Sequence, residues 1–322
     1  MIKTLCFLFV ASFASYSSSS ANNQEDSQIL EKNTISSSQK KLFVLTSTKT
    51  LQALIQKIAG DLLKIESLIK AKQDPHYLSA KPSYMLKANK ADLLVLNGLD
   101  LEVGWLPNVI KGSRNPKIQK GKPAYLDVSD FIKPLSVVET KVDRFFGDIH
   151  PLGNPHFLLD PIKAIKVSKA IADKLSEMDS SNQSLYKKNQ EEFEKNIFNK
   201  VKEWKQRIEQ SKIKKIVSYH SSFEYFLERF NLQLVGLIEE KPGIPPSSKH
   251  VLQLVKKMKE EQVVCVLYSS FYQTKWTKKV KDMTKAQVYS VAVEVGALET
   301  VKNYTMLIEE IVQAIESCKQ VK

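Results

Sequence analysis

The stretch Gly147–Pro161 holds two of the five histidines of the chain in a short segment rich in turn formers. His150 and His156 are separated by Pro151, Gly153, Asn154 and Pro155. Asp160 and Pro161 then open a long helical pattern, with Asp at an N-cap position and Pro at the first helical position. A histidine on a stiff loop that leads into a helix is held in place at little entropic cost, as a preformed metal or catalytic site requires. The stretch taken alone is equally consistent with a surface loop whose histidines are solvated.

Two further histidines occupy comparable places. His76 follows Asp74 and Pro75 after an expected strand in Leu62–Ile69, and His220 ends an expected strand over Ile213–Tyr219. Proteins of the α/β class place ligand groups at the carboxyl ends of their strands. A cleft between two lobes would therefore bring His76, His156 and His220 together. Any one of these histidines could be structural, but three at corresponding positions favour a site.

The spacing of apolar residues predicts an α/β fold in two halves, each with its own central sheet. Strands are expected at Lys41–Ser47, Leu62–Ile69, Ala91–Leu96, Lys122–Val128, Ile213–Tyr219, Leu232–Ile238, Val263–Tyr268 and Gln287–Val293. Helices are expected at Leu51–Ala59, Lys81–Asn89, Leu101–Ile110, Ile162–Met178, Ser222–Phe230, Lys249–Glu261, Thr274–Met283 and Glu299–Cys318.

One more helix is expected between the two halves, over Gln183–Gln210. It is long and highly charged, and its few apolar residues recur at helical spacing. A helix of this length with so little apolar surface is typical of a bridge between two lobes. We therefore predict an N-terminal α/β lobe over 41–182, a connecting helix over 183–210 and a C-terminal α/β lobe over 211–322.

The first residues predict export. Lys3 precedes the apolar run Leu5–Ala14, which is shorter than the roughly 20 residues a membrane-spanning helix needs. We interpret 1–21 as a signal peptide, with cleavage after Ala21 or Ala14, and 22–40 as a disordered Ser- and Asn-rich leader. Cys6 lies too early in the apolar run to be a convincing lipid-attachment site. The mature protein is expected to be soluble and periplasmic or otherwise extracytoplasmic.

The chain carries a formal net charge of +13, with lysines in most of the expected helices. No zinc-finger, helix-turn-helix or RNA-binding pattern accompanies this charge, and export argues against a nucleic-acid partner. We interpret the lysines as a solvated surface with some affinity for anionic membranes. The mature chain keeps Cys265 and Cys318, and an oxidising compartment favours one disulfide between them over a buried thiol and a frayed terminal one.

Four stretches spread over the mature chain carry a family resemblance. They are DPHYLSAKPSYMLKANKADLLVLNGLDLE, GNPHFLLDP, YHSSFEYFLERFNL and KPGIPPS. At these residues the sequence resembles the zinc- and manganese-binding solute-binding proteins of bacterial ABC importers, the metal-binding cluster A-I family. The resemblance implies two α/β lobes joined by one long rigid helix, with metal held between the lobes by His76, His156 and His220. It also implies transfer of a divalent metal to the transmembrane subunits of an ABC permease, and we expect a monomer.

The chain departs from the family pattern at the fourth ligand. The family commonly places an Asp in a strand-end segment just before a Gly, whereas Glu294 in VAVEVGA is displaced by one position. His150 or a water molecule could complete the site instead. The family also often has Tyr-Glu-Pro where this chain has Leu78-Ser79-Ala80, so a carboxylate behind the first histidine is missing from the motif.

The ligand types favour zinc as the metal. Three neutral imidazoles and at most one carboxylate suit tetrahedral Zn²⁺, whereas Mn²⁺ prefers more carboxylate oxygen. Manganese and iron remain alternatives. A zinc hydrolase is a competing class, but the chain has neither HExxH nor Gly-x-Ser-x-Gly, so we expect no enzyme. A surface adhesin is the other alternative, because a lysine-rich exported protein could bind host or matrix components.

Overall fold

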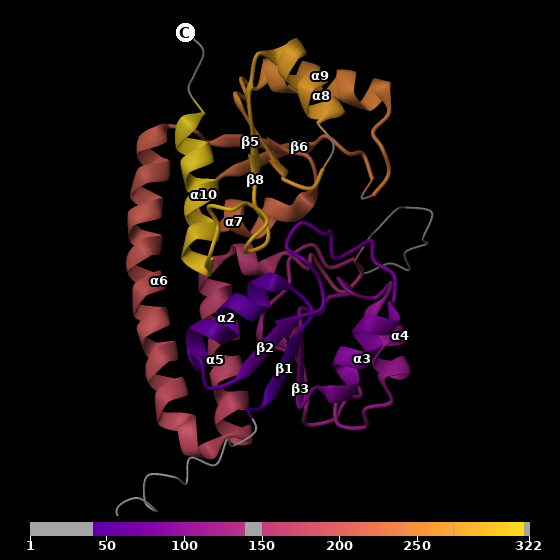
Figure 1. Cartoon of the computed structure of the whole chain (residues 1–322). Helices are drawn as coiled ribbons and strands as arrows, with labels where there is room; N and C mark the ends of the chain where they lie inside the picture. Colours follow the sequence, from indigo (N-terminus) through magenta and orange to yellow (C-terminus); the bar gives the residue numbers. More distant parts are fainter. Residues whose placement is uncertain (1–40, 139–149, 242, 273, 319–322) are drawn as a thin grey trace, which may run out of the picture. The chain divides into compact units, whose positions relative to one another are not determined.

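The computed structural model describes residues 41–138, 150–241, 243–272 and 274–318. The predicted signal peptide and leader, 1–40, lie outside this part, as do the first three residues of the Gly147–Pro161 stretch. The described chain forms two α/β lobes, each built on a four-stranded parallel sheet flanked by helices (Figure 1). The predicted fold class is thereby confirmed. No helix in the described ranges combines the length and the apolar character that crossing a membrane demands.

The first sheet has the strand order β2-β1-β3-β4. Its strands are β1 (Phe43–Thr46), β2 (Lys64–Ser67), β3 (Leu93–Leu96) and β4 (Tyr125–Asp127). The central strands β1 and β3 are buried along their whole length, as expected for a parallel sheet covered on both faces. Helices α2 (Lys49–Ala59), α3 (Pro82–Lys90) and α4 (Leu106–Ser113) connect these strands and cover the sheet.

The second sheet repeats the arrangement with the order β6-β5-β7-β8. Its strands are β5 (Lys215–Ser218), β6 (Gln233–Leu237), β7 (Cys265–Ser269) and β8 (Gln287–Val291). Helices α7 (Glu224–Arg229), α8 (Ser248–Glu260) and α9 (Lys275–Thr284) alternate with them, and α10 (Tyr304–Ser317) closes the lobe. In each sheet the strand order reverses beside the first strand, and in such sheets ligands bind beyond the carboxyl strand ends.

Two long helices join the lobes. Helix α5 (Pro161–Met178) is capped by Asp160, and α6 (Gln183–Ser211) then runs alongside both lobes (Figure 1). Asn189 in α6 donates a 2.8 Å hydrogen bond to the carbonyl of Ile58 in the first lobe. Near its other end, Trp204 Nε1 donates to Glu309 Oε2 in α10 at 2.7 Å. The long helix predicted over 183–210 is therefore present and is bonded to each lobe.

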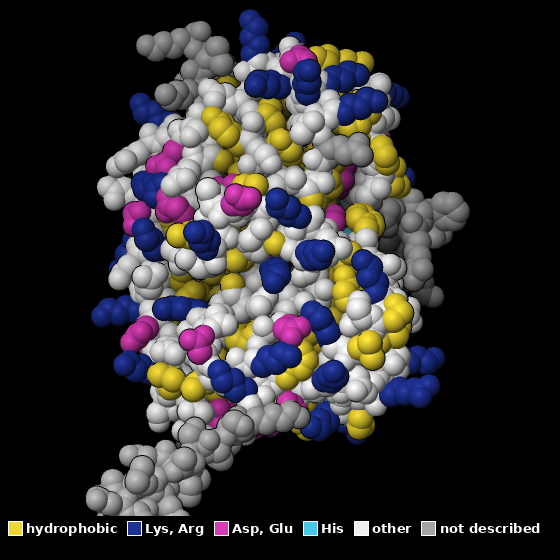
Figure 2. All heavy atoms as spheres, viewed as in Figure 1, with side chains coloured by type: hydrophobic (Ala, Val, Ile, Leu, Met, Phe, Trp, Pro, Cys, Tyr) yellow, Lys and Arg dark blue, Asp and Glu magenta, His cyan; other side chains and the backbone are white. Residues whose placement is uncertain are grey.

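The core is continuous between the lobes. One apolar cluster includes buried side chains from both sheets and from α2, α5, α6 and α10. Separate clusters fill the other face of each sheet, under α3 and α4 in the first lobe and under α8 and α9 in the second. On the surface, Figure 2 shows lysine and arginine side chains scattered over the visible face, with acidic side chains between them.

Two predicted helices start later than expected. The helix predicted over Leu101–Ile110 begins at Leu106, because Leu99 and Asp100 adopt positive φ and make a turn first. The helix predicted over Glu299–Cys318 begins at Tyr304, because the side chain of Asn303 accepts a hydrogen bond from the amide of Met306 and caps the helix there. In both places a turn or a capping residue outweighed the apolar periodicity on which the prediction was based.

Cys265 in β7 and Cys318 after α10 form a disulfide with an S–S distance of 2.03 Å. Both residues are buried, and they lie 53 positions apart in the sequence. The bond fastens the last helix to a central strand of the second sheet.

Replacing both cysteines, as Cys265→Ser/Cys318→Ser, is expected to lower the free energy of unfolding by about 2–4 kcal/mol, because the unfolded chain regains the freedom that the cross-link removes. Urea denaturation of the parent and the variant measures the difference. The control is the parent in strong reductant, which should become as unstable as the variant. Equal stability of oxidised parent and variant would contradict a stabilising role for the bond.

Candidate metal centre

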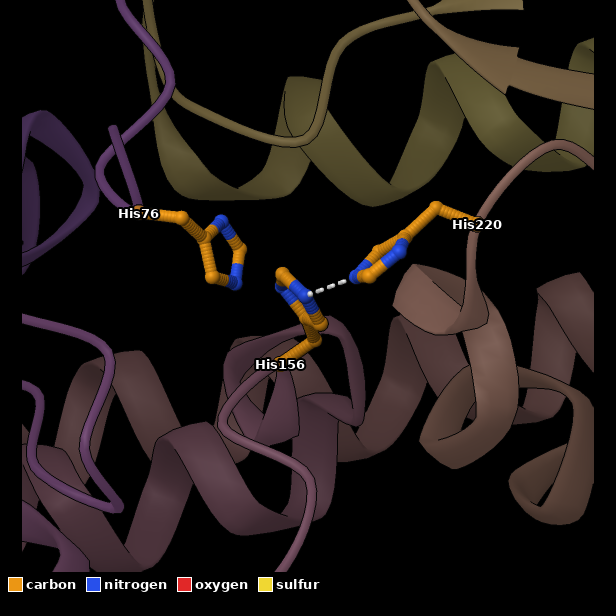
Figure 3. A group of neighbouring side chains, drawn as sticks. All are labelled: His76, His156 and His220. Atoms are coloured by element: carbon orange, nitrogen blue, oxygen red, sulfur yellow. Dashed lines mark hydrogen bonds between the residues drawn. The ribbon is translucent and has the colours of Figure 1, made fainter. Parts of the chain in front are cut away.

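Three imidazoles from different segments of the chain converge between the lobes. His76, His156 and His220 each place a ring nitrogen within 4.8 Å of the others, and the three side chains point toward one another (Figure 3). The Nε2 atoms of His156 and His220 lie 3.2 Å apart. The ring centroid of His76 lies 5.2 Å from that of His156 and 5.6 Å from that of His220. The three residues that the sequence analysis selected are thus brought together.

His76 is held by its own loop. Asp74 Oδ1 accepts a 3.0 Å hydrogen bond from the His76 backbone amide and lies 2.6 Å from His76 Nδ1. Burial would raise the pKa of Asp74, but its hydrogen bonds with His76 prevail and hold that pKa below its usual value. The carboxylate is therefore ionised and requires a proton on Nδ1, which leaves the lone pair on Nε2. Trp105 Nε1 fixes the loop further by donating to the carbonyl of Pro75 at 2.8 Å.

The positions of His76 and His220 in their sheets are not equivalent. His220 comes two residues after β5, the first strand of its sheet. His76 follows β2, the second strand of the other sheet, and lies well beyond Ser67 at the strand end. The expectation of corresponding topological positions, with His76 at a strand end, was therefore wrong. The loop with Asp74, Pro75 and His76 is long enough to reach the site, and its hydrogen bonds hold it there.

His156 comes from the loop before α5. Its backbone amide donates to Asn154 Oδ1 at 2.9 Å, and the preceding carbonyl of Pro155 accepts from Asn97 Nδ2 at 2.9 Å. Asn154 Nδ2 donates to the carbonyl of Ser221 at 2.8 Å, so this loop is bonded directly to the loop of His220.

His220 is oriented by a carboxylate from the neighbouring strand end. Glu239, which follows β6, forms a hydrogen bond with His220 Nδ1, and both side chains are buried. The backbone amide of Glu239 donates to the carbonyl of Tyr219 at 3.0 Å, which fixes the distance between the two segments. As with His76, a carboxylate on Nδ1 turns Nε2 toward the cluster.

Burial and crowding keep His156 and His150 neutral. Burial, followed by the nearby His76 and His220, lowers the pKa of His156 well below its usual value. The same causes, in the same order, lower the pKa of His150 to about 3. Both rings are therefore uncharged near neutral pH, which is the protonation state a metal ligand needs.

His150 lies beside the cluster. Its ring centroid is 5.1 Å from that of His76. Its Nε2 atom is buried and has no hydrogen-bond partner among the residues that the structure describes. A buried unpaired nitrogen is uncommon and indicates a missing partner. The structure thus places His150 next to the three convergent histidines, although its ring nitrogens do not belong to the closest group.

Glu294 does not join the cluster. Its Oε2 accepts hydrogen bonds from the amide and the hydroxyl of Thr50, at 2.8 and 2.7 Å, at the start of α2. A cavity of about 20 Å³ touches both Glu294 and His156, enough space for one water molecule. Glu294 was expected to be a ligand. In the structure its carboxylate instead ties the second lobe to the first-lobe helix.

The sequence analysis missed Asp74 and Glu239 as residues of the site. The role of Asp74 could have been predicted, because an Asp two residues before a His on a Pro-containing turn can form a hydrogen bond with that His. Glu239 had no comparable signal, since its partner lies 19 positions away and only the pairing of β5 with β6 brings them together.

One protein-family model matches most of the chain. A family model described as zinc-uptake complex component A, periplasmic, matches residues 44–318, nearly all of the described chain. The chain therefore belongs to this family. It is the substrate-binding component of a metal ABC transporter, acts outside the cytoplasm, and is not an enzyme.

Curated relatives cover most of the chain at modest identity. The metal ABC transporter substrate-binding lipoprotein ScbA of Streptococcus cristatus is 25% identical, over 81% of this chain and 82% of its own length. The manganese ABC transporter substrate-binding lipoprotein PsaA of Streptococcus mitis is 27% identical, over 78% and 79%.

Solved structures share the fold. A ZnuA deletion mutant with zinc bound aligns with a TM-score of 0.72 at 21% identity, over 88% of this chain and 99% of that one. A manganese-bound mutant of the periplasmic metal binding protein from Candidatus Liberibacter asiaticus aligns with a TM-score of 0.70 at 24% identity, over 86% and 98%.

The bond between Glu294 and Thr50 predicts a pH dependence of stability. Burial is the main reason that the pKa of Glu294 is raised from 4.5 to about 7. The folded state thus binds a proton that the unfolded state releases, and this contribution to stability is lost as the pH rises from about 5 to 8. Glu294→Gln keeps an acceptor for Thr50 but cannot ionise, so its stability relative to the parent should rise by up to about 3 kcal/mol over this range.

Urea denaturation of both proteins at several pH values between 5 and 8 measures the effect. Glu102, whose pKa burial likewise raises to about 7, is present in both proteins, so most of its contribution cancels from the difference. A difference in stability that does not change with pH would refute the assignment to Glu294.

Proposed function

We propose that this chain captures a divalent transition metal outside the cytoplasm, zinc in particular, through His76, His156 and His220, and delivers it to the transmembrane subunits of an ABC permease. The observation that carries the proposal is the convergence of three imidazoles from separate segments of the chain, whose ring nitrogens lie within 4.8 Å of one another. Ring nitrogens that separate segments bring this close together form the donor set that one small cation needs.

The spacing of the nitrogens supports a single small ion. Two nitrogens bound to one tetrahedral zinc, each at 2.0–2.1 Å, are about 3.3 Å apart. The Nε2 atoms of His156 and His220 lie 3.2 Å apart. These two ligands are thus already spaced for zinc, and little rearrangement is needed on binding.

Two carboxylates support the ligands from behind. Asp74 on His76 Nδ1 and Glu239 on His220 Nδ1 fix the tautomer and the orientation of each ring and make Nε2 a stronger donor to metal. This pairing is a frequent companion of histidine ligands and distinguishes the cluster from three incidental core histidines.

The donor set favours zinc over manganese. The closest group of donor atoms consists of imidazole nitrogens, and nitrogen-rich sites bind zinc more tightly than manganese. Several relatives carry manganese in their names, and one structural neighbour has zinc bound, which makes manganese the second candidate. Iron is third.

His150 is the better supported candidate for a fourth ligand. Its Nε2 is buried without a partner in the described part of the chain, whereas the carboxylate of Glu294 is engaged by Thr50. A water molecule is the alternative, and either would complete a tetrahedral shell.

Both lobes contribute to the site. His76 and His156 precede α6 in the chain and His220 follows it, so a bound ion would link the lobes and favour their closed arrangement. Helix α6 is bonded to both lobes, which supports a small closing motion. The permease would recognise this closed state. Export by the signal peptide 1–21 is part of the proposal.

The chelator-stripped protein is expected to bind one equivalent of zinc, and more tightly than manganese. His220→Ala should weaken zinc binding by at least about 100-fold, because a direct ligand matters more than its supporting partner. Competition titrations with a metal indicator measure both affinities. His250→Ala is the matched control, since that ring lies in α8 and bonds to the carbonyl of Leu237. If the parent binds no transition metal, the proposed function is refuted; preference for manganese would overturn only the choice of metal.

The supporting carboxylates provide a second, graded expectation. Asp74→Asn and Glu239→Gln should each weaken zinc binding by about 10–100-fold, because an amide holds the histidine less firmly and reduces the basicity of Nε2. The same titrations apply, with circular dichroism to verify folding. Asp173→Asn, which removes an exposed carboxylate paired with Lys169 in α5, serves as the control. Affinities equal to that of the parent would show that the carboxylates do not support the ligands.

A further inference from the structure

A side chain of the first lobe reaches a turn of the second lobe beside the histidine cluster. Tyr77 directly follows His76, and its side chain is 55% exposed. Its hydroxyl occupies the space next to Gly243: a Cβ atom built on this glycine would lie 1.9 Å from the Tyr77 oxygen. The absence of a side chain at position 243 is therefore what permits the contact.

The turn that contains Gly243 belongs to the same segment as a residue of the site. The amide of Ile244 donates to the carbonyl of Lys241 at 3.0 Å, and Gly243 has a φ of +74°, which favours glycine. Lys241 comes shortly after Glu239, the carboxylate on His220. The contact with Tyr77 therefore connects the segment that orients His220 with the segment that holds His76.

A second tyrosine, Tyr272, lies beside His220. The ring of Tyr272 is stacked on Tyr219, with centroids 4.6 Å apart, and lies 6.1 Å from the ring of His220. Burial, followed by the charges of Asp74 and Glu239, raises its pKa. Tyr272 thus packs on the second-lobe side of the site, next to His220, whereas Tyr77 is largely exposed.

The other connections between the lobes are stronger and lie elsewhere. Helix α6 is bonded to the first lobe through Asn189 and to the second through Arg207, which forms ion pairs of 2.8 and 2.6 Å with α10. Arg229 of α7 binds the buried carboxylate of Asp160 through two 2.8 Å hydrogen bonds. The contact of Tyr77 with Gly243 lies apart from these connections, so it can be disturbed without breaking them.

We propose that the contact of Tyr77 with Gly243 is an inter-lobe latch that sets the rate at which bound metal enters and leaves the histidine cluster. The histidines determine the affinity, and the latch determines how often the cluster is accessible. This inference rests on the proposed function, because it concerns exchange of the same ion. It adds a rate-controlling contact that involves no ligand.

A glycine pair in the chain provides a sharp test. Gly243→Ala places a methyl group where the Tyr77 hydroxyl lies and should open the latch. Gly121→Ala is the matched control, because Gly121 also has a positive φ, +80°, but a methyl group there would meet no atom of the described residues within 4 Å. Both variants therefore carry similar backbone strain, and only one disturbs the contact.

The measurement is stopped-flow release of zinc from the loaded protein into excess chelator, together with the rate of zinc uptake by the stripped protein. Gly243→Ala should speed release about fivefold to tenfold, the scale of one lost contact of hydrogen-bond strength. Uptake should accelerate as well, so the equilibrium affinity should change less than the release rate. Gly121→Ala should match the parent.

A double-mutant cycle identifies the partner. Tyr77→Ala alone should also speed release, and adding Gly243→Ala to it should have no further effect, because both changes break the same contact. Equal release from the two glycine variants, or additive effects in the cycle, would overturn the latch while leaving the proposed function intact. If release became faster while uptake stayed unchanged, the affinity would fall. That result would indicate a distorted site and would also overturn the latch. Absence of zinc binding by the parent would refute the proposed function and the latch together.

Discussion

The structure depends on holding three imidazoles close together between the lobes, with His156 kept uncharged. A charged imidazole would be costly there, because burial and its neighbours both oppose protonation. A nitrogen of each ring nevertheless faces the others, which requires that the rings be held in place from outside the cluster. Asp74 and Glu239 meet this need by holding the Nδ1 atoms of His76 and His220. The two carboxylates come from different lobes, so both lobes must be in place for the two rings to be held.

The rest of the fold supplies the necessary rigidity. Helix α6 is bonded to both lobes, and one apolar core continues from the first sheet to the second. Glu294 with Thr50, Asn154 with Ser221, and Asp160 with Arg229 join the lobes at further points. A frame of this kind allows a small motion near the site and opposes a wide hinge. The protein must hold an ion firmly and still release it. Control of access by one contact near the surface meets both needs without a wide hinge motion.

The chemistry of the site follows from its donors. Imidazole nitrogens dominate the closest group, with carboxylates behind them, which suits a borderline-soft ion such as zinc better than a hard one. Family membership establishes a metal-transport component and leaves the metal to the site itself, because relatives named for manganese and a neighbour with zinc bound share this fold. Ligand geometry and ligand type therefore carry the argument for the cargo.

The sequence by itself determined what depends on neighbouring residues. Apolar periodicity located the strands and most helices, and the long helix over 183–210 was evident from its charge and length. The three histidines stood out by their places in expected loops and at expected strand ends. Tertiary structure decided which side chains form hydrogen bonds with one another. The bond of His220 with Glu239 spans 19 positions and that of Thr50 with Glu294 spans 244, so neither follows from local pattern. The later starts of α4 and α10 were decided by a turn and by a cap. The physical reason is that a side chain's position along the chain fixes its local geometry, whereas its hydrogen-bond partner is fixed only when distant segments are packed together.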